Sequence, residues 1–308
     1  MKILGTGSYL PEKVYDNSYM ESIVDTSDEW IVTRTGIRQR HIEEQSSVHM
    51  ALEAARRALE DAQVAPETLG AVICATITPD NAVPCTACQV IYELGITCPA
   101  FDLSAACTGF LYAMKTAEAF VKEGRPVLVI GMDRLSKIVD YTDRSTCVLF
   151  GDGAGAAVLG VGEEIRYIGL HAYGDPKGSL LVPAEDGPER KHCIYMDGQA
   201  VFKFATKELS RAAKEAMEAL GLTAEDIDFV IPHQANLRII DAAARRLKMP
   251  MEKFFVNVDT VGNTSAASIP VALDQASRAG RMKQGDTVLI VGFGGGLTSG
   301  AAIVTWSK

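Results

Sequence analysis

The chain lacks the long apolar runs of membrane-spanning proteins, the excess of basic charge of nucleic-acid-binding proteins and the even set of cysteines of disulfide-rich secreted proteins. No apolar run approaches the ~18 residues that a helix needs to cross a bilayer, and the start, MKILGTGSYLPEKV, lacks the apolar stretch of a secretory signal. A net charge of −9 disfavours nonspecific binding to nucleic acid or anionic membranes. The seven cysteines are an odd number in a chain of 308 residues that can bury its own core, which predicts reduced thiols. We therefore expect a cytoplasmic globular protein with no nucleic-acid or membrane partner.

The sequence is similar to itself at a fixed offset. Shifted by 158 positions (212 − 54), residues 54–76 align without a gap with residues 212–234, helix-like segment over helix-like segment and strand-like over strand-like. Each copy continues with a predicted short strand, small residues and a helix, in FDLSAACTGF (101–110) and VNVDTVGNTSAAS (256–268). The fold therefore looks duplicated.

A buried strand and a glycine-rich segment then follow in each copy. The strands are VLVIG (127–131) and VLIVG (288–292), which are continuously apolar. Such strands, alternating with helices, predict an α/β protein whose sheets are covered by helices on both faces. We expect two similar halves, residues 1–164 and 165–308, with matching loops that meet at a central cleft.

Cys107 lies where a strand-like segment joins a helix-like one. A helix that begins there would direct unpaired N–H groups and a positive dipole end at the sulfur, which favours the thiolate. Ala105, Ala106 and Gly109 are small and leave room for an incoming acyl group. Cys107 is thus a candidate nucleophile, although a small buried cysteine can also serve only to fill the core. Core packing is what we expect of Cys74, Cys98, Cys147 and Cys193.

Two other motifs resemble ligand sites without completing their patterns. Cys85 and Cys88 form a CTAC pair, but no second Cys or His pair has a matching ligand spacing, so we expect core packing and no metal. GDGAGAA (151–157) has Ala156 where the dinucleotide pattern has its last glycine, which favours tight packing over cofactor binding.

Two polar residues lie at positions where α/β proteins often do chemistry. His233 follows the strand-like DFVI and precedes a helix, and it is either a turn histidine bonded to backbone or a catalytic group. Asn263, in the second copy's counterpart of the Cys107 loop, by itself would be a helix cap or a turn residue.

Six motifs, in order and covering essentially the whole chain, resemble the β-ketoacyl-acyl-carrier-protein synthase III family. They are DTSDEWIVTRTGIRQRHI (25–42), DLSAACTGF (102–110), DRSTCVLFGDGAGAAVL (143–159), PHQANLRII (232–240), NVDTVGNTSAAS (257–268) and GFGGGLTSGAA (292–302). The resemblance implies the thiolase fold, a duplicated five-layer α/β/α/β/α arrangement, in a homodimer without a cofactor. It also implies an acyltransferase that condenses a short acyl-CoA with malonyl-acyl-carrier protein, releasing CoA and CO2, to begin fatty-acid synthesis.

The resemblance assigns Cys107, His233 and Asn263 as a catalytic trio. It places the backbone amides of Cys107 and Gly295 in an oxyanion hole. No carboxylate is required, because loss of CO2 itself makes the carbanion, and donors to the thioester oxygen are needed instead of a strong base.

The resemblance also assigns contacts to CoA. Trp30 and Arg144 match the residues that enclose the adenine by stacking and cation–π contact. Residues matching contacts along the pantetheine tunnel are Thr26, Arg34, Gly198, Phe202 and Asn236.

A basic segment lies close to these positions. Residues 233–253 hold five cations and two anions, a balance of 5 − 2 = +3 in a chain of −9. Such a run is usually a solvated helix face. Beside a tunnel mouth it would be a landing site for an acidic carrier protein. The carrier-binding candidates are Lys203, Arg238, Arg245 and Arg246.

The chain departs from the family pattern in places. CTGF stands where CAGF is common, and one residue is missing before CPAF. In the family, the residue preceding the proline of VPC (83–85) reaches the partner's acyl pocket and limits chain length. Here it is Val83, smaller than an aromatic residue, so we expect tolerance of longer or more branched primers. Two alternatives are a ketosynthase or acyltransferase of secondary metabolism with the same fold, and a noncatalytic homologue that only binds carrier protein.

Overall fold

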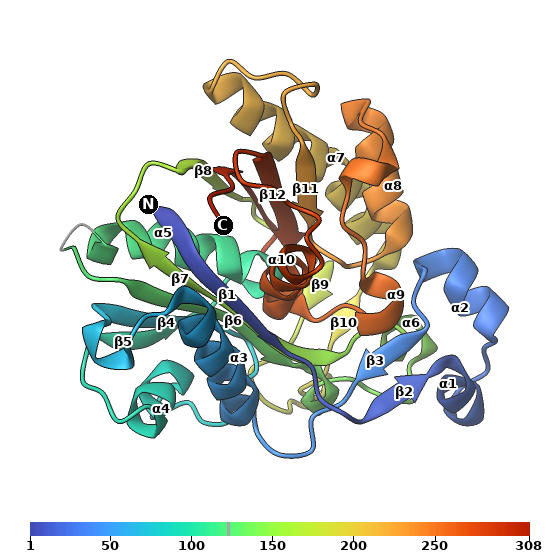
Figure 1. Ribbon diagram of the computed structural model, residues 1–308. Coiled ribbons are helices and arrows are strands. Elements are labelled where there is room, and N and C mark those ends of the chain that lie inside the picture. The colour runs from blue at the N-terminus through green and yellow to red at the C-terminus, as the bar shows by residue number, and fades with distance from the viewer. Residues whose placement is uncertain (122–123) are drawn as a thin grey trace.

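The computed structural model describes residues 1–121 and 124–308. It is built around two large sheets with helices between and outside them (Figure 1), and two small two-stranded sheets lie beside them. The strands are β1 (Lys2–Tyr9), β2 (Val14–Asp16), β3 (Gln39–His41), β4 (Ala71–Ala75), β5 (Ala100–Leu103), β6 (Val127–Arg134), β7 (Asp152–Gly160), β8 (Ile165–Ala172), β9 (Leu180–Leu181), β10 (Tyr195–Met196), β11 (Phe229–Pro232), β12 (Thr287–Gly294) and β13 (Thr298–Thr305). The small sheets pair β2 with β3 and β9 with β10. The helices are α1 (Asn17–Ile23), α2 (Asp28–Thr35), α3 (Ser47–Ala62), α4 (Thr86–Glu93), α5 (Gly109–Val121), α6 (Arg144–Cys147), α7 (Gly198–Ala219), α8 (Leu237–Leu247), α9 (Val258–Val261) and α10 (Ser268–Arg278). None of the described helices is long and apolar enough to cross a membrane.

The two large sheets repeat one topology. The first has the order β1-β7-β6-β4-β5 and the second β11-β12-β13-β8. In the first sheet β4 and β6 are parallel, and β7 and β1 continue from β6 as antiparallel neighbours. In the second, β11 and β12 are parallel, and β13 and β8 continue from β12 in the same way. β4 begins at Ala71 and β11 at Phe229, which is the same 158-residue offset that the sequence shows (229 − 71).

Five layers result from how the helices cover these sheets. α5 and α10 lie between the sheets and contact both, α3 and α4 cover the outer face of the first, and α7 and α8 cover the outer face of the second (Figure 1). β4 and β6 therefore show no polar alternation, because both of their faces are buried. The predicted layered α/β architecture is confirmed.

Tight packing explains the glycines of β7. A Cβ on Gly155 would lie 2.6 Å from the backbone nitrogen of Val271, so α10 can approach β7 closely only where a side chain is missing. The packing interpretation of GDGAGAA is thus confirmed.

The predicted strand at the start of residues 256–268 is wrong. Val258–Val261 forms the short helix α9, whose last amides, with that of Gly262, bond back to the carbonyls of Asn257 and Val258. The amide of Asn257 donates to Oε1 of Gln234 instead of to a neighbouring strand. Only a single parallel bridge between Val230 and Phe254 remains beside β11.

Two matching turns bring the halves together at the centre. The 3-10 turn Ala106–Thr108 precedes α5 and the 3-10 turn Ser265–Ala267 precedes α10, and the two turns lie against each other. We call them the Cys107 elbow and the Asn263 elbow. Each holds a non-glycine residue in the left-handed region, Ala106 at φ 45° and Ser265 at φ 50°. Such backbone costs about 1–3 kcal/mol and persists only where its surroundings hold it.

Candidate active site

A small pocket of about 130 Å³ brings together the three residues assigned as a catalytic trio. Cys107 comes from its elbow, His233 follows β11, and Asn263 precedes its own elbow. They are distant in sequence, yet all three side chains line this pocket. The duplicated topology explains the meeting, because equivalent loops of the two halves face each other across the centre.

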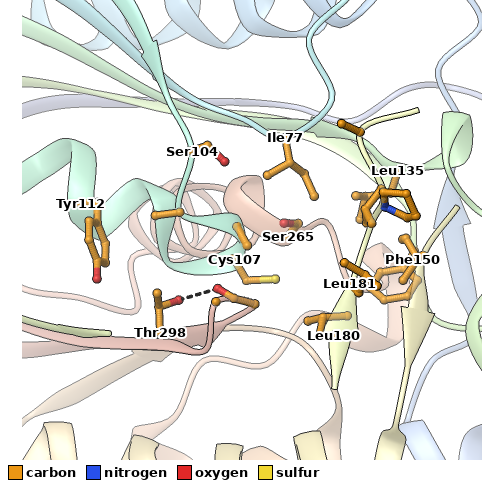
Figure 2. Close-up of a pocket in the computed structure, with 18 of the residues that line it drawn as sticks. Ile77, Ser104, Cys107, Tyr112, Leu135, Phe150, Leu180, Leu181, Ser265 and Thr298 are labelled. Atoms are coloured by element: carbon orange, nitrogen blue, oxygen red, sulfur yellow. Dashed lines mark hydrogen bonds between the residues drawn. The ribbon is translucent and has the colours of Figure 1, made fainter. Parts of the chain in front are cut away.

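Cys107 is nearly enclosed, with 7% of its surface exposed. Its side chain points into a pocket beside Ser265 and Leu180 (Figure 2). Burial raises the pKa of the Cys107 thiol to about 12, and the carboxylate of Asp133 adds to the rise. The backbone amide beside the sulfur does lower the pKa, as the helix terminus predicts. Removing the sulfur from water outweighs this contribution, so the expected net downward shift is wrong here.

His233 is held by its backbone, while its ring nitrogens are left free. The amide of His233 donates to the carbonyl of Val291 (2.8 Å), and the ring packs edge-to-face with Phe293 at a centroid distance of 5.2 Å. Within the described chain neither ring nitrogen has a hydrogen-bond partner. Burial lowers the pKa of His233 to about 3, so the imidazole is neutral and offers one N–H donor to the pocket.

Asn263 is oriented by three hydrogen bonds. Its amide donates to the carbonyl of Leu149 (2.9 Å), and its own carbonyl accepts from the amide of Gly151 (3.0 Å). The side-chain Oδ1 accepts from the amide of Ser265 (3.0 Å). Because Oδ1 is engaged in the elbow, Nδ2 is the end of the side chain that remains to serve a ligand in the pocket.

The glycine-rich end of β12 packs against the Cys107 elbow. A Cβ on Gly294 would lie 2.9 Å from the backbone nitrogen of Cys107, so only glycine fits there. Gly295 lies next to it and lines the larger pocket beside Cys107, and its carbonyl accepts from Oγ1 of Thr298 (3.0 Å). The pairing of the Gly295 and Cys107 amides in an oxyanion hole stays a prediction.

That larger pocket, of about 660 Å³, also has Cys107 in its wall (Figure 2). Its wall is mostly apolar and includes Ile77, Leu135, Phe150, Leu181 and Ile194. Val83, the residue that resemblance relates to an acyl pocket, is not part of this wall and is 88% exposed.

A third cavity, of about 700 Å³, contains most of the predicted CoA contacts. It is lined by Trp30, Arg34, Gly198, Phe202 and Asn236, among others. The last three of these also line the pocket of the trio, so the cavity continues from Trp30 toward Cys107.

Two guanidinium groups stack on Trp30. Arg34 and Arg144 each lie 4.9 Å from the ring, and Arg144 donates to the carbonyl of Asp25 (2.7 Å). Thr26 lies in the loop before α2 and does not line the cavity.

The four predicted carrier-binding residues are all exposed on α7 and α8. Arg238 lies over the ring of Phe202, at the edge of the Trp30 cavity. Arg245 pairs with Asp241 (2.5 Å) at the surface, where such a pair adds little stability. Arg246 lines a separate shallow groove with Lys207 and Lys214.

Sequence reasoning missed two residues beside the trio. Asp133, at the end of β6, is fully buried and bonds to the Asn263 elbow, and Ser265 supplies the strained residue of that elbow. The signal for Asp133 was a carboxylate directly after the apolar run VLVIGM, where a buried charge needs several donors. No signal marked Ser265 except its place in the repeat.

The remaining cysteines are free thiols. Cys74 and Cys147 are buried, and Cys85, Cys88, Cys98 and Cys193 are half-buried. Cys85 is the residue before α4, without a capping hydrogen bond from its side chain, and Cys88 lies in the first turn. Over residues 1–121 and 124–308 no cluster of three or more His, Cys, Asp or Glu side chains is placed to hold a metal ion.

Known proteins resemble the chain along its full length. Residues 101–176 match the family model described as 3-oxoacyl-[acyl-carrier-protein (ACP)] synthase III, and residues 217–306 match the model of its C-terminal part. A beta-ketoacyl-[acyl-carrier-protein] synthase III of Caldanaerobacter subterraneus subsp. tengcongensis is 51% identical over 99% of this chain and 98% of that protein.

Solved structures agree with this match. The 3-oxoacyl-[acyl-carrier-protein] synthase III of Aquifex aeolicus VF5 is 47% identical, with a TM-score of 0.94 over 99% of both chains. The priming β-ketosynthase of the R1128 polyketide pathway is 38% identical, with a TM-score of 0.93 over 99% of this chain and 96% of that one. With this agreement in sequence and in fold, the chain belongs to the β-ketoacyl-acyl-carrier-protein synthase III family of thiolase-fold condensing enzymes.

Proposed function

We propose that the protein catalyses the condensation that begins fatty-acid synthesis. A short acyl-CoA and malonyl-acyl-carrier protein would give 3-oxoacyl-acyl-carrier protein, CoA and CO2. One observation carries this proposal: the thiol of Cys107, the unpartnered ring nitrogens of His233 and the side-chain amide of Asn263 line the same pocket. Identity of about 50% to relatives named synthase III supports the same assignment.

The first half-reaction would load Cys107. Its Sγ attacks the carbonyl carbon of the acyl-CoA thioester, the bond to the CoA sulfur breaks, and the thiol proton passes to that sulfur. Because burial keeps Cys107 protonated, the proton leaves as the carbon–sulfur bond forms. The amides of Cys107 and Gly295 would stabilise the negative charge on the carbonyl oxygen.

The second half-reaction would use the other two residues. As CO2 leaves the malonyl group, negative charge develops on its thioester oxygen, where an N–H of neutral His233 and Nδ2 of Asn263 would donate hydrogen bonds. The resulting carbanion attacks the acyl carbon on Cys107, and the cysteine sulfur leaves and regains a proton. Donors suffice for this step, since no proton has to be abstracted from carbon.

Substrates would approach through the cavity beside Trp30. We propose that the CoA adenine lies between Trp30 and Arg144, which requires the guanidinium to move from its present contact with the ring. The pantetheine arm would pass Arg34, Gly198, Phe202 and Asn236, which line the two connected cavities. Thr26, which the resemblance also assigns to the tunnel, lies outside these walls. An acidic carrier protein would dock on the exposed faces of α7 and α8 through Lys203, Arg238, Arg245 and Arg246, of which Arg238 lines the cavity mouth.

The assembly that we propose is a cytoplasmic homodimer. Each protomer would consist of the halves 1–164, with the nucleophile, and 165–308, with His233 and Asn263. The exposed Val83 would enter the partner's 660 Å³ pocket and set the room left for the primer. A valine there leaves more space than an aromatic residue would, so primers longer or more branched than acetyl should be accepted.

Intact-mass spectrometry and CO2 release test the proposal together. The parent protein should gain the mass of one acyl group from acyl-CoA, and a Cys107→Ser variant should not. The variant should still release CO2 from malonyl-acyl-carrier protein, because His233 and Asn263 remain. Absence of both the adduct and CO2 release from the parent would refute the proposed function, whichever acyl-CoA primers are offered. A polyketide-type role would instead show as a preference for primers outside fatty-acid metabolism.

A further inference from the structure

We infer that Asp133 is a positioning residue that holds the Asn263 elbow in its working geometry. This inference rests on the proposed function, because it assigns Asp133 an effect on one of the two half-reactions. Asp133 is fully buried behind the Cys107 and Asn263 elbows and does not line the pocket of the trio. It would therefore act through the elbow and make no contact with substrate.

One carboxylate oxygen binds the Asn263 elbow directly. Oδ2 of Asp133 accepts a hydrogen bond from the amide of Ala266 (3.1 Å). The amide before it, that of Ser265, donates to Oδ1 of Asn263 (3.0 Å). Two successive amides of one strained turn are thus held from two sides, and the orientation of the Asn263 side chain depends on that turn.

The other oxygen binds the wall of the larger pocket. Oδ1 of Asp133 accepts from the amide of Ile77 (2.8 Å) and from the hydroxyls of Thr76 (3.0 Å) and Thr78 (3.1 Å). Ile77 itself lines the 660 Å³ pocket beside Cys107. The carboxylate therefore joins this wall to the Asn263 elbow.

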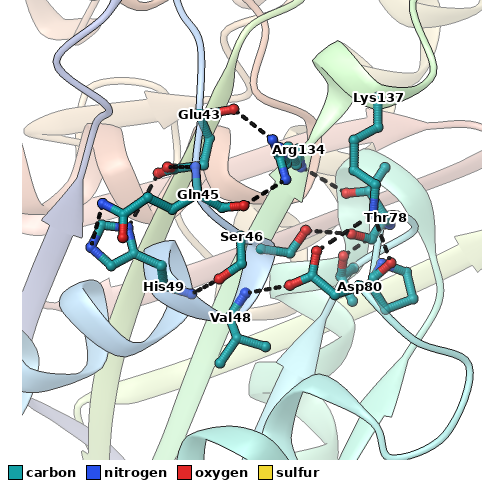
Figure 3. A network of polar contacts seen from close by, with 12 residues as sticks. Glu43, Gln45, Ser46, Val48, His49, Thr78, Asp80, Arg134 and Lys137 are labelled. Carbon is teal, nitrogen blue, oxygen red and sulfur yellow. Dashed lines mark hydrogen bonds and ion pairs between the residues drawn. The ribbon is translucent and has the colours of Figure 1, made fainter.

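A polar network fixes the segment that carries these donors. The hydroxyl of Thr78 also accepts from the amide of Arg134 (2.7 Å), and Asp80 accepts from the amide of Val48 (3.0 Å). Figure 3 shows Thr78 and Asp80 between Arg134, Lys137 and Val48. The carbonyl of Thr78 also accepts from the hydroxyl of Ser47 on α3 (2.8 Å), so the Thr76–Thr78 side is anchored without Asp133. Asp133 therefore ties the strained elbow to a fixed point.

A carboxylate suits this position better than its amide isostere, asparagine. It has only acceptors, and all four of its partners are donors. An asparagine has one oxygen and one NH2 group, so in either orientation its NH2 would face a backbone N–H, of Ala266 or of Ile77. Leaving a buried donor unsatisfied is unfavourable, and Ser265 could then relax from its positive φ.

The test compares Asp133→Asn with a matched variant, Asp152→Asn. Asp152 is also fully buried and accepts from two amides and a hydroxyl, of Glu43 and Ser136, but none of these partners belongs to an elbow. For each folded variant, CO2 release from malonyl-acyl-carrier protein and acylation of Cys107 by acyl-CoA are measured. Asp133→Asn should reduce CO2 release at least about tenfold more than acylation, whereas Asp152→Asn should change both rates alike.

A second substitution tests the physical cause. Glycine adopts a positive φ without strain, so adding Ser265→Gly to Asp133→Asn should restore part of the CO2 release. The inference is overturned if Asp133→Asn lowers both half-reactions equally, or if the double variant recovers nothing. Failure of both Asp133 variants to fold, while Asp152→Asn folds, would assign Asp133 to core stability alone and would equally overturn it. Since the parent protein is assayed in parallel, an inactive parent marks a failure of the proposed function instead.

Discussion

Substitutions of Asn263 separate the two tasks of its side chain. Oδ1 caps the amide of Ser265, and Nδ2 is assigned to the thioester oxygen of the malonyl group. Asn263→Ala removes both tasks. Asn263→Asp keeps an oxygen for Ser265 but replaces the donor with a second carboxylate oxygen.

The expected magnitudes follow from this difference. Loss of one fixed donor in a water-excluded site costs about 3 kcal/mol, or roughly a hundredfold in rate. Asn263→Ala should therefore slow CO2 release by about that factor, and loss of the cap should lower the free energy of unfolding by about 1 kcal/mol. Asn263→Asp should slow CO2 release still more, because a buried carboxylate repels the charge that develops on the thioester oxygen. Its free energy of unfolding should be closer to that of the parent than the value for Asn263→Ala, because an oxygen for Ser265 remains.

Three measurements on the same preparations check this prediction. CO2 release is followed with malonyl-acyl-carrier protein, Cys107 acylation by intact mass, and the free energy of unfolding by denaturant titration. Both variants should still be acylated, since the nucleophile and the amides of its elbow are unchanged. If Asn263→Ala releases CO2 at nearly the parent rate, or if Asn263→Asp is the more active of the two, the role given to Nδ2 is wrong.

Three further predictions concern charge, pH and the primer. Arg238→Glu, alone or with Arg246→Glu, should weaken use of malonyl-acyl-carrier protein and spare acylation by acyl-CoA, because it repels an acidic partner at the cavity mouth. An Arg56→Glu control on the distant helix α3 should leave both rates unchanged, and equal losses in both half-reactions would contradict the docking assignment. Burial lowers the pKa of His233 from 6.5 to about 3, so between these values the unfolded chain binds a proton that the folded chain does not. The free energy of unfolding should then fall as the pH drops through this interval, by up to about 1.4 kcal/mol per pH unit. Urea titrations at several pH values should show a smaller fall per pH unit for His233→Gln than for the parent, and an equal fall would refute the burial argument. Val83→Phe should lower kcat/KM for long or branched acyl-CoA primers more than for acetyl-CoA, and an unchanged primer profile would show that Val83 does not limit the acyl pocket.

The sequence by itself determined the architecture and the chemical groups. Continuous apolar strands required helices on both faces of each sheet, and the 158-residue repeat required the topology to occur twice. Motif resemblance singled out Cys107, His233 and Asn263, and the structure places all three in one pocket. Local pattern was less reliable at residues 256–268, where a side-chain contact from Gln234 replaced the expected strand pairing.

Only the tertiary structure decided the electrostatics and the supports of the site. A helix terminus beside Cys107 is visible in the sequence, but the degree of burial is not, and burial raises the pKa of the thiol instead of lowering it. In the sequence, Asp133 lies just beyond the predicted strand 127–131 and carries no sign of its partners. Three of its four donors lie more than 50 residues before it in the sequence, and the fourth, Ala266, lies 133 residues after it. Only the folded chain brings these donors to one carboxylate. Desolvation and satisfied hydrogen bonds depend on such distant neighbours, which is why the sequence could name the reacting groups and not the environment that sets their protonation and orientation.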